Sequence, residues 1–370
     1  MLAPQERLAF SDYSSLYDLI IPQDNLLRRI NSLIDFSFVY NELVSKYCPD
    51  NGRIAESPVR LCYNPIDRMN ILYRILFAFL YLLSLLPLRL LYLLSDILFF
   101  PLFYVVKYRR KVVEKQLAEC FPGKTVRERL AVERQFYHFF CDYVMEVIKM
   151  FSISREEMKR RMEFTNLDEV RADLEREDKK FCFLYLGHYC NWEYIASLSS
   201  WIPDMHGGQI YHRIYNKAFD ELFLRLRGQF GGESILMKDT LRRILTLRKQ
   251  EKKVMIGFIA DQLPKLENMN HWTHFLNHET SFFIGAERIA KQVDAALYYV
   301  DVERVKRGYY RATFRLMTLH PKEYADYDLT DWYARLLEES IRRRPAYWLW
   351  THKRWKRTKE QWLEWKQSNA

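Results

Sequence analysis

The sequence predicts an α/β fold with a mostly parallel central sheet flanked by helices. Two short apolar runs, at 181–186 and 253–260, have the length and continuity of strands that are buried on both faces. Stretches with helical periodicity, such as 126–150, lie between and around such runs. Chemically reactive side chains follow both runs directly, where ligands of open parallel sheets bind. These are His188 and Asp261.

The remaining elements follow from periodicity and turn residues. Further strands are expected at 208–212, 296–300 and 309–317, and further helices at 112–120, 155–162 and 217–227. The aromatic residues near His138 are expected in the core, and His138 itself is expected to be structural. The main domain is predicted to cover residues 112–370.

A very apolar segment precedes this domain, at residues 69–111. Pro87 and Pro101 are expected to end or kink its helices, and a basic cluster at 107–111 closes it. We interpret the segment as a membrane anchor, with one spanning helix followed by an interfacial one and the basic cluster on the cytoplasmic side. The alternative is a buried pair of apolar helices.

Composition and charge narrow the function. The chain has 370 residues and a formal net charge of +10, which favours an anionic partner such as nucleic acid, an acidic membrane surface or an acidic carrier protein. Its six cysteines contain no Cys-x-x-Cys pair and fit reduced thiols in a cytoplasmic compartment. His271, His274 and His278 lie close in sequence, but no cysteine or carboxylate pattern completes a zinc site, so no metal is expected.

The stretch after the first buried strand carries the predicted chemistry. Gly187 allows a turn that presents His188, and Asn191 is a good N-cap for a helix beginning at Trp192. On one continuous helix His188 and Glu193 would point about 140° apart, so they meet only across a strand–turn–helix junction. There Glu193 could hold Nδ1–H while Nε2 faces a substrate hydroxyl. A turn histidine with satisfied hydrogen bonds is the alternative.

His-Tyr-Cys-Asn-Trp-Glu at 188–193 resembles the motif of the late acyltransferases of lipid A biosynthesis, within the lysophospholipid acyltransferase superfamily. The ending Pro-x-x-Trp-Leu-Trp-x-His-x-Arg-Trp at 345–355 is similar to the closing signature of that family. The resemblance runs from about Met69 to the end of the chain. It implies His188 and Glu193 as catalytic residues. It also implies a set of substrate-binding residues: Asn191, Arg213, Asp261, Arg288 and Arg354. For Asp261, a plain strand-end cap is the alternative.

The resemblance further implies an O-acyltransferase at the cytoplasmic face of the inner membrane. Its donor would be acyl carrier protein and its acceptor a hydroxyl of a lipid A precursor, with no cofactor, no nucleic acid bound by the main domain, and a monomeric state. A lysophospholipid or an amino-acid lipid is the alternative acceptor.

The first 62 residues have a different character. The sequence of this region, including Lys46-Tyr47-Cys48-Pro49-Asp50-Asn51-Gly52, resembles the N-terminal helical region of insertion-sequence transposases. We interpret residues 1–62 as a small all-α remnant fused ahead of the acyltransferase-like part. An ordinary helical extension is one alternative, and a DNA-binding function carried by this segment is the other.

Overall fold

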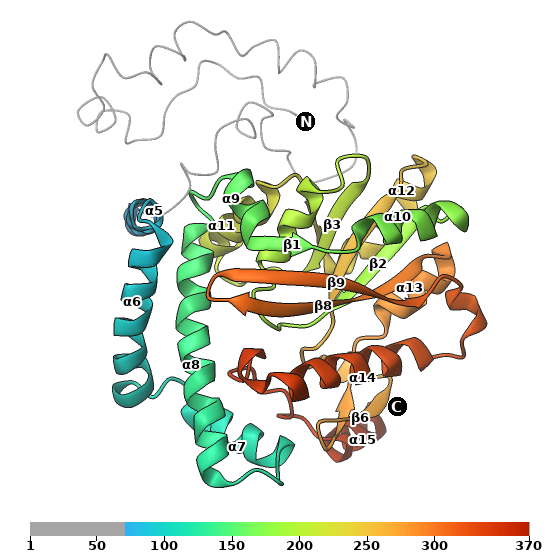
Figure 1. Cartoon of the computed structure of the whole chain (residues 1–370). Coiled ribbons are helices and arrows are strands. Elements are labelled where there is room, and N and C mark those ends of the chain that lie inside the picture. Colours follow the sequence, from blue (N-terminus) through green and yellow to red (C-terminus); the bar gives the residue numbers. More distant parts are fainter. Residues whose placement is uncertain (1–70, 370) are drawn as a thin grey trace, which may run out of the picture. The chain divides into compact units, whose positions relative to one another are not determined.

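The computed structural model describes residues 71–369, so the helical extension expected over residues 1–62 lies outside the described part. The chain divides into two units at Leu76 and Phe77, and every element after α5 belongs to the second unit. A run of helices, α6 to α9, comes first, and helices and strands are interleaved from β1 onwards (Figure 1). The α-helices are α5 Ile71–Ser84, α6 Leu88–Phe100, α7 Arg110–Cys120, α8 Val126–Lys149, α9 Arg155–Arg161, α10 Leu167–Arg176, α11 Lys217–Gly228, α12 Thr240–Lys249, α13 Gly285–Val293, α14 Asp328–Arg343 and α15 Lys359–Ser368.

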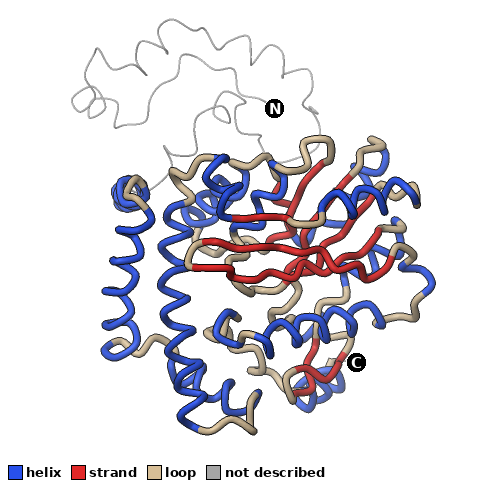
Figure 2. The backbone as a smooth tube through the Cα atoms, in the orientation of Figure 1, coloured by secondary structure: helices blue, strands red, loops and turns tan. Residues whose placement is uncertain are grey.

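Seven strands form the main sheet, in the order β1-β9-β8-β2-β5-β3-β4. All neighbours pair in parallel except β8 and β9, so β1 and β9 run opposite to the other five strands. This confirms the predicted α/β class with a mostly parallel sheet. A separate antiparallel hairpin, β6–β7, lies near the C-terminal helix (Figures 1 and 2). The strands are β1 Met162–Phe164, β2 Phe181–Leu186, β3 His206–Tyr211, β4 Glu233–Leu236, β5 Val254–Ile259, β6 Trp272–Phe275, β7 His278–Ser281, β8 Ala296–Lys306 and β9 Tyr309–Thr318.

Strand β2 occupies the middle of the sheet. Every one of its six residues is buried, as expected for an unbroken apolar run with sheet neighbours on both edges and helices on both faces. It pairs with β5 from Phe181 opposite Val254 to Leu186 opposite Ile259, and with β8 on its other edge. This register decides which side chains meet beyond the carboxyl end of the sheet.

The apolar segment breaks at its prolines, as predicted. Helix α5 ends at Ser84, α6 begins directly after Pro87, and Pro101 opens a π-helical turn, Pro101–Val105. The stretch Leu88–Val105 is long and apolar enough to cross a membrane by length and composition. Helix α6 lies beside the 24-residue helix α8 (Figure 1).

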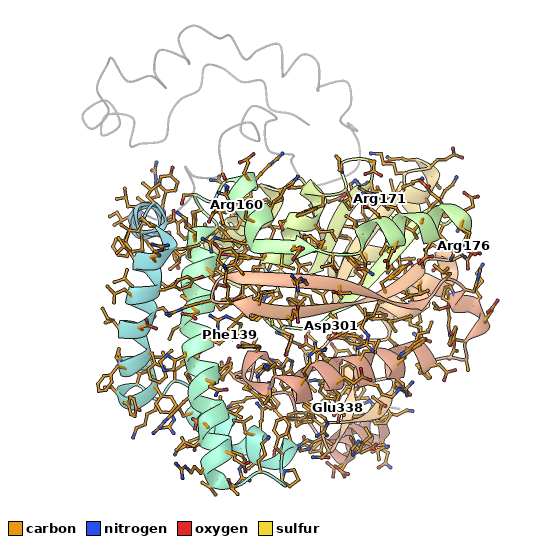
Figure 3. The ribbon with its side chains drawn as sticks, viewed as in Figure 1. Phe139, Arg160, Arg171, Arg176, Asp301 and Glu338 are labelled. Carbon is orange, nitrogen blue, oxygen red and sulfur yellow. The ribbon has the colours of Figure 1, made fainter. Side chains whose placement is uncertain are left out.

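Helix α8 connects the apolar segment to the sheet. Its N-terminus has a capping box, in which Thr125 and Glu128 satisfy each other's backbone N–H groups. Phe139 lies on the side of α8 that faces the β8–β9 pair (Figure 3), where the Arg304 guanidinium lies 5.6 Å from the centre of its ring. The expectation that the aromatic residues of this helix lie in the core is confirmed for Phe136, Tyr137 and Phe139.

Candidate active site

The chain turns sharply after β2. A Cβ atom at Gly187 would lie 2.7 Å from Leu337 Cδ1 and 3.3 Å from Asp261 Oδ2, so a larger residue where β2 leaves the sheet would displace the buried Leu337. Cys190, three residues on, has a left-handed backbone with φ 52°. The turn therefore directs His188 towards the end of the neighbouring strand β5.

The C-terminal segment holds this turn in place. The backbone N–H of Cys190 donates to Tyr347 O at 2.9 Å, and that of Leu349 donates to His188 O at 3.1 Å. Tyr189 and Trp348 form an isolated antiparallel bridge between these two hydrogen bonds. The tryptophan-rich ending thus acts as a short strand laid against the histidine turn.

His188 is held by Asp261. Its Nδ1 lies 2.6 Å from Asp261 Oδ1, and its backbone N–H donates to Oδ2 at 2.9 Å. The indole N–H of Trp348 donates to the same Oδ2 at 2.8 Å. The register of β2 with β5 explains why the two side chains meet. Leu186 pairs with Ile259, and His188 and Asp261 each lie two residues further along the chain.

Asp261 is the charged member of this pair. Its side chain is only 2 % exposed. Burial raises the pKa of Asp261, but the attraction of His188 and the hydrogen bonds from His188 and Trp348 outweigh burial and lower the pKa to about 2. The carboxylate is therefore ionised at neutral pH, and it fixes Nδ1 as the protonated nitrogen of the imidazole.

The other imidazole nitrogen faces Gln262. The side-chain amide nitrogen of Gln262 lies 3.2 Å from His188 Nε2, and the imidazole side chain is 18 % exposed. Since Nδ1 donates to Asp261, Nε2 is the acceptor and the amide is the donor. A hydroxyl that donated to Nε2 would lie beside this amide.

His352 shapes the loop that carries Gln262. Its Nε2 accepts the backbone N–H of Leu263 at 3.3 Å. Burial lowers the pKa of His352 to about 4, although the negative charge of Asp261 opposes this. His352 is therefore neutral at pH 7 and can accept this hydrogen bond.

Acidification is expected to destabilise the protein through His352. Between its ordinary pKa of 6.5 and the folded value of about 4, the unfolded chain binds a proton that the folded chain does not, so the free energy of unfolding falls as the pH is lowered. The full effect is about 3 kcal/mol. Urea unfolding of the wild type and His352→Gln between pH 7 and 4 measures it. Parallel curves for the two proteins would contradict the assignment, because they share their other titrating groups and differ at His352.

The hypothesis that Glu193 holds the imidazole is wrong in this geometry. Glu193 is 4 % exposed and forms a two-point ion pair with Arg227 of α11, at 2.8 Å to Nε and 2.7 Å to Nη2. Spacing within the motif takes no account of the strand and the C-terminal segment that pack against it. The left-handed Cys190 and the pairing with Trp348 turn His188 towards β5, which leaves Glu193 facing α11.

Asn191 is buried and structural. Its Oδ1 accepts the backbone N–H of Tyr194 at 3.2 Å, in the manner of a cap, and its Nδ2 donates to Glu146 Oε2 on α8 at 2.7 Å. The following helix is a 3-10 helix, Tyr194–Ser200, rather than an α-helix from Trp192. Both ends of the Asn191 amide are therefore hydrogen-bonded within the protein.

The three predicted basic residues do not converge on His188. Arg213 is 65 % exposed after β3, with Asp220 at 3.8 Å. Arg288 is exposed on α13. Arg354 is only 1 % exposed and donates to Ser281 O at 2.6 Å, so it braces the C-terminal segment from inside. None of the three contacts the imidazole.

Sequence reasoning missed four residues around the site: Gln262, Arg227, Trp348 and His352. The signal for Gln262 was present, because it follows Asp261 directly after a buried strand. Trp348 and His352 belong to the closing signature at 345–355, which the sequence tied to the family but not to the histidine turn. Arg227 carried no signal, since its partner 34 residues earlier is found only in three dimensions.

The histidines at 271, 274 and 278, which lie close in sequence, do not share a set of partners. His271 Nε2 lies 2.6 Å from Asp331 Oδ1 on α14, and the ring of His278 stacks on Trp355 at 4.3 Å. Within residues 71–369, no group of three His, Cys, Asp or Glu side chains is arranged to hold a metal ion.

Comparison with known proteins agrees with both parts of the sequence interpretation. The family model of a transposase domain (DUF772) matches residues 15–64, which precede the described part. A search of curated proteins found no match. The family model of the bacterial lipid A biosynthesis acyltransferases matches residues 68–357, which include the His188 turn, Asp261 and the closing signature. Since this match covers more than half of the chain, the protein belongs to the bacterial lipid A biosynthesis acyltransferase family.

Proposed function

We propose that this protein transfers a fatty acyl chain from acyl carrier protein to a hydroxyl of a lipid A precursor, with His188 as general base and Asp261 as its orienting partner. The observation that carries the mechanism is the 2.6 Å contact between His188 Nδ1 and Asp261 Oδ1. With the Nδ1 proton directed to Asp261, Nε2 is the nitrogen available to take a proton from a hydroxyl, and the side chain is 18 % exposed. Family membership supports the acyl-transfer class.

The reaction balances without a covalent enzyme intermediate. Nε2 of His188 takes the proton of the acceptor hydroxyl while the hydroxyl oxygen forms a bond to the thioester carbonyl carbon. Collapse of the tetrahedral intermediate breaks the carbon–sulfur bond, and the imidazolium returns its proton to the leaving thiolate. The ionised Asp261 stabilises the imidazolium between these two steps.

Charge supports the choice of partners. The formal net charge of +10 attracts an acidic carrier protein and an anionic lipid surface. A lysophospholipid or an amino-acid lipid would undergo the same chemistry. Lipid profiling by mass spectrometry after deletion of the gene distinguishes them, because only the true product is lost.

The direct test is an assay of the purified chain with acyl carrier protein thioester and lipid A precursor. Transfer is expected for the wild type, and His188→Ala is expected to lose it while keeping its circular dichroism spectrum. Full activity of the variant would exclude the mechanism.

Gln262 is proposed to donate to the oxyanion. Its amide lies beside Nε2, so it would adjoin the carbonyl oxygen of a thioester attacked there. Gln262→Leu, which keeps the approximate volume and removes the donor, is expected to lower kcat by about 10²-fold with little change in KM. Gln262→Glu serves as a comparison, since a carboxylate at this place would oppose the oxyanion. Unchanged kcat in Gln262→Leu would rule the role out.

The transposase match favours a second candidate function, DNA binding by the first residues. The acyltransferase match begins at residue 68, after the transposase match ends at residue 64. Deletion of residues 1–67 is expected to leave kcat and KM for acyl transfer within about twofold, because no site residue is removed. Electrophoretic mobility shift with the full chain and the shortened chain tests for DNA binding. Loss of transfer on deletion would show that the two parts work together.

A further inference from the structure

One face of the apolar segment carries exposed apolar side chains. On α6, Leu90, Leu93, Ile97 and Phe100 recur at helical spacing and are 47–62 % exposed. We call these residues the apolar strip, together with Leu82, Leu85, Tyr104, Val105 and Val106, which are 42–70 % exposed. Exposed apolar side chains gathered along one helix face are typical of an interaction site.

The opposite face of the same helix is packed. Leu88, Leu91 and Ser95 are buried on α6, as is Phe103 in the turn that follows. The ring of Phe99 stacks on His138 of α8 with 3.5 Å between ring centres. Helix α6 is thus one side of a helix pair and leaves only its outer face free.

Polar contacts hold α6 along α8. Ser95 donates to Asp142 at 2.7 Å, and Tyr92 donates to Glu146 at 2.9 Å. As residue numbers rise along α6, those of the partners on α8 fall, from Glu146 to Asp142 and then His138. Just before α6, Lys149 of α8 donates to Ser84 O at 2.8 Å. The two helices are therefore antiparallel, and α6 lies beside the C-terminal half of α8 (Figure 1).

An ion-pair network extends this attachment to the sheet. Arg307, at the β8–β9 turn, binds Asp96 of α6 at 2.6 Å and Asp142 of α8 at 2.5 Å. Arg304 of β8 adds a contact to Asp142 at 2.7 Å. Asp142 is 4 % exposed, and removal of α6 would take away the Ser95 hydroxyl that donates to it.

This attachment decides the orientation of α6 in a membrane. A perpendicular α6 would carry the antiparallel α8, about 36 Å long, through the hydrocarbon core with it. Helix α8 exposes Arg134 and Gln135 and carries the ion pairs of Asp142 to the sheet. Charged groups inside a bilayer are disfavoured, so the packed pair argues against the perpendicular arrangement.

Charge complementarity identifies the surface that covers the strip. Exposed Lys107, Arg109 and Lys111 directly follow it, and Arg89 is exposed at its other end. Arg109 donates to Thr351 O at 2.9 Å, next to His352, so this basic end adjoins the segment that supports the site. Apolar side chains with a basic flank are typical of helices that lie in the interface of an anionic bilayer.

We propose that the apolar strip lies in the plane of an anionic membrane interface, with α6 parallel to the surface and not spanning it. The occupant is the lipid bilayer, and the inference holds whatever acceptor the site uses. It differs from the spanning helix expected from the sequence. Basic residues at the end of the strip contact the headgroups, and the packed face keeps α8 and the sheet in water.

Spin labels on the full chain test the proposal. Cysteine is introduced singly at Leu90, Leu93, Ile97 or Phe100, with Cys48 and Cys62 replaced by serine, since Cys120, Cys141, Cys182 and Cys190 are buried. Label depth is measured by oxygen and nickel-chelate accessibility in phosphatidylethanolamine/phosphatidylglycerol vesicles. All four labels are expected at one shallow depth, and a control label at Arg134 is expected in water.

Other depth profiles would overturn the proposal. A spanning helix places Ile97 about 10 Å deeper than Leu90. Strip labels shielded from both reagents, with spin–spin coupling between copies, would indicate a second chain as the occupant. Labels that reach the nickel chelate freely would show that no bilayer covers the strip.

A second variant tests the basic flank without changing the strip. Lys107→Gln with Lys111→Gln is expected to weaken vesicle binding about 30-fold, as two lost contacts to anionic headgroups predict. Vesicles of phosphatidylcholine alone are the control, where the variant and the wild type should bind equally. Equal binding to anionic vesicles would contradict the headgroup contact.

Discussion

Asp261→Asn is expected to lower kcat for acyl transfer by about 10³-fold, within the range that general-base catalysis contributes. The amide keeps the shape of the side chain, but it removes the negative charge that faces His188 Nδ1 at 2.6 Å. The imidazolium formed during the reaction then loses its partner, and Nε2 is no longer held as the unprotonated nitrogen. The measurement is kcat with saturating thioester and acceptor.

The chain contains a matched control for this variant. Asp331 lies 2.6 Å from His271 Nε2, the same distance as in the active-site pair, but it belongs to α14 beside the β6–β7 hairpin. Asp331→Asn removes a histidine–aspartate contact of the same kind and is expected to leave kcat unchanged. If both variants lose activity equally, the loss reports stability rather than catalysis.

Glu193→Gln is expected to lower the free energy of unfolding by about 3 kcal/mol, because it breaks a buried ion pair and leaves Arg227 without its carboxylate. Glu193 is 4 % exposed and the Arg227 side chain 20 %, so water cannot replace the lost partner fully. The denaturation midpoint measures this effect. The loss of activity is expected to follow the loss of folded protein.

A double replacement separates the two roles of Glu193. Glu193→Met with Arg227→Met removes both charges and is expected to recover most of the stability. Under the Asp261 mechanism it also recovers much of the transfer activity per folded molecule. If the double variant is stable but inactive, Glu193 acts on the chemistry itself, and the Glu193 hypothesis from the sequence is restored.

Local pattern was sufficient for much of the fold. The unbroken apolar run at 181–186 predicted both ends of β2, because in a strand buried on both faces the apolar run and the strand begin and end together. Pro87 and Pro101 predicted the breaks in the apolar segment, since proline acts on the backbone wherever it stands. Strand β1 was missed, because three residues with one exposed side chain form too short a pattern.

The position of His188 at the end of β2 was determined by the sequence alone, because a buried run followed by glycine has few other structures. The choice of its partner was not. Asp261 lies 73 residues away and Glu193 only five, yet the parallel register of β2 and β5 brings Asp261 to Nδ1. The closing segment turns the motif so that Glu193 meets Arg227. Hydrogen-bond partners depend on which strands are neighbours, and only the tertiary structure decides that.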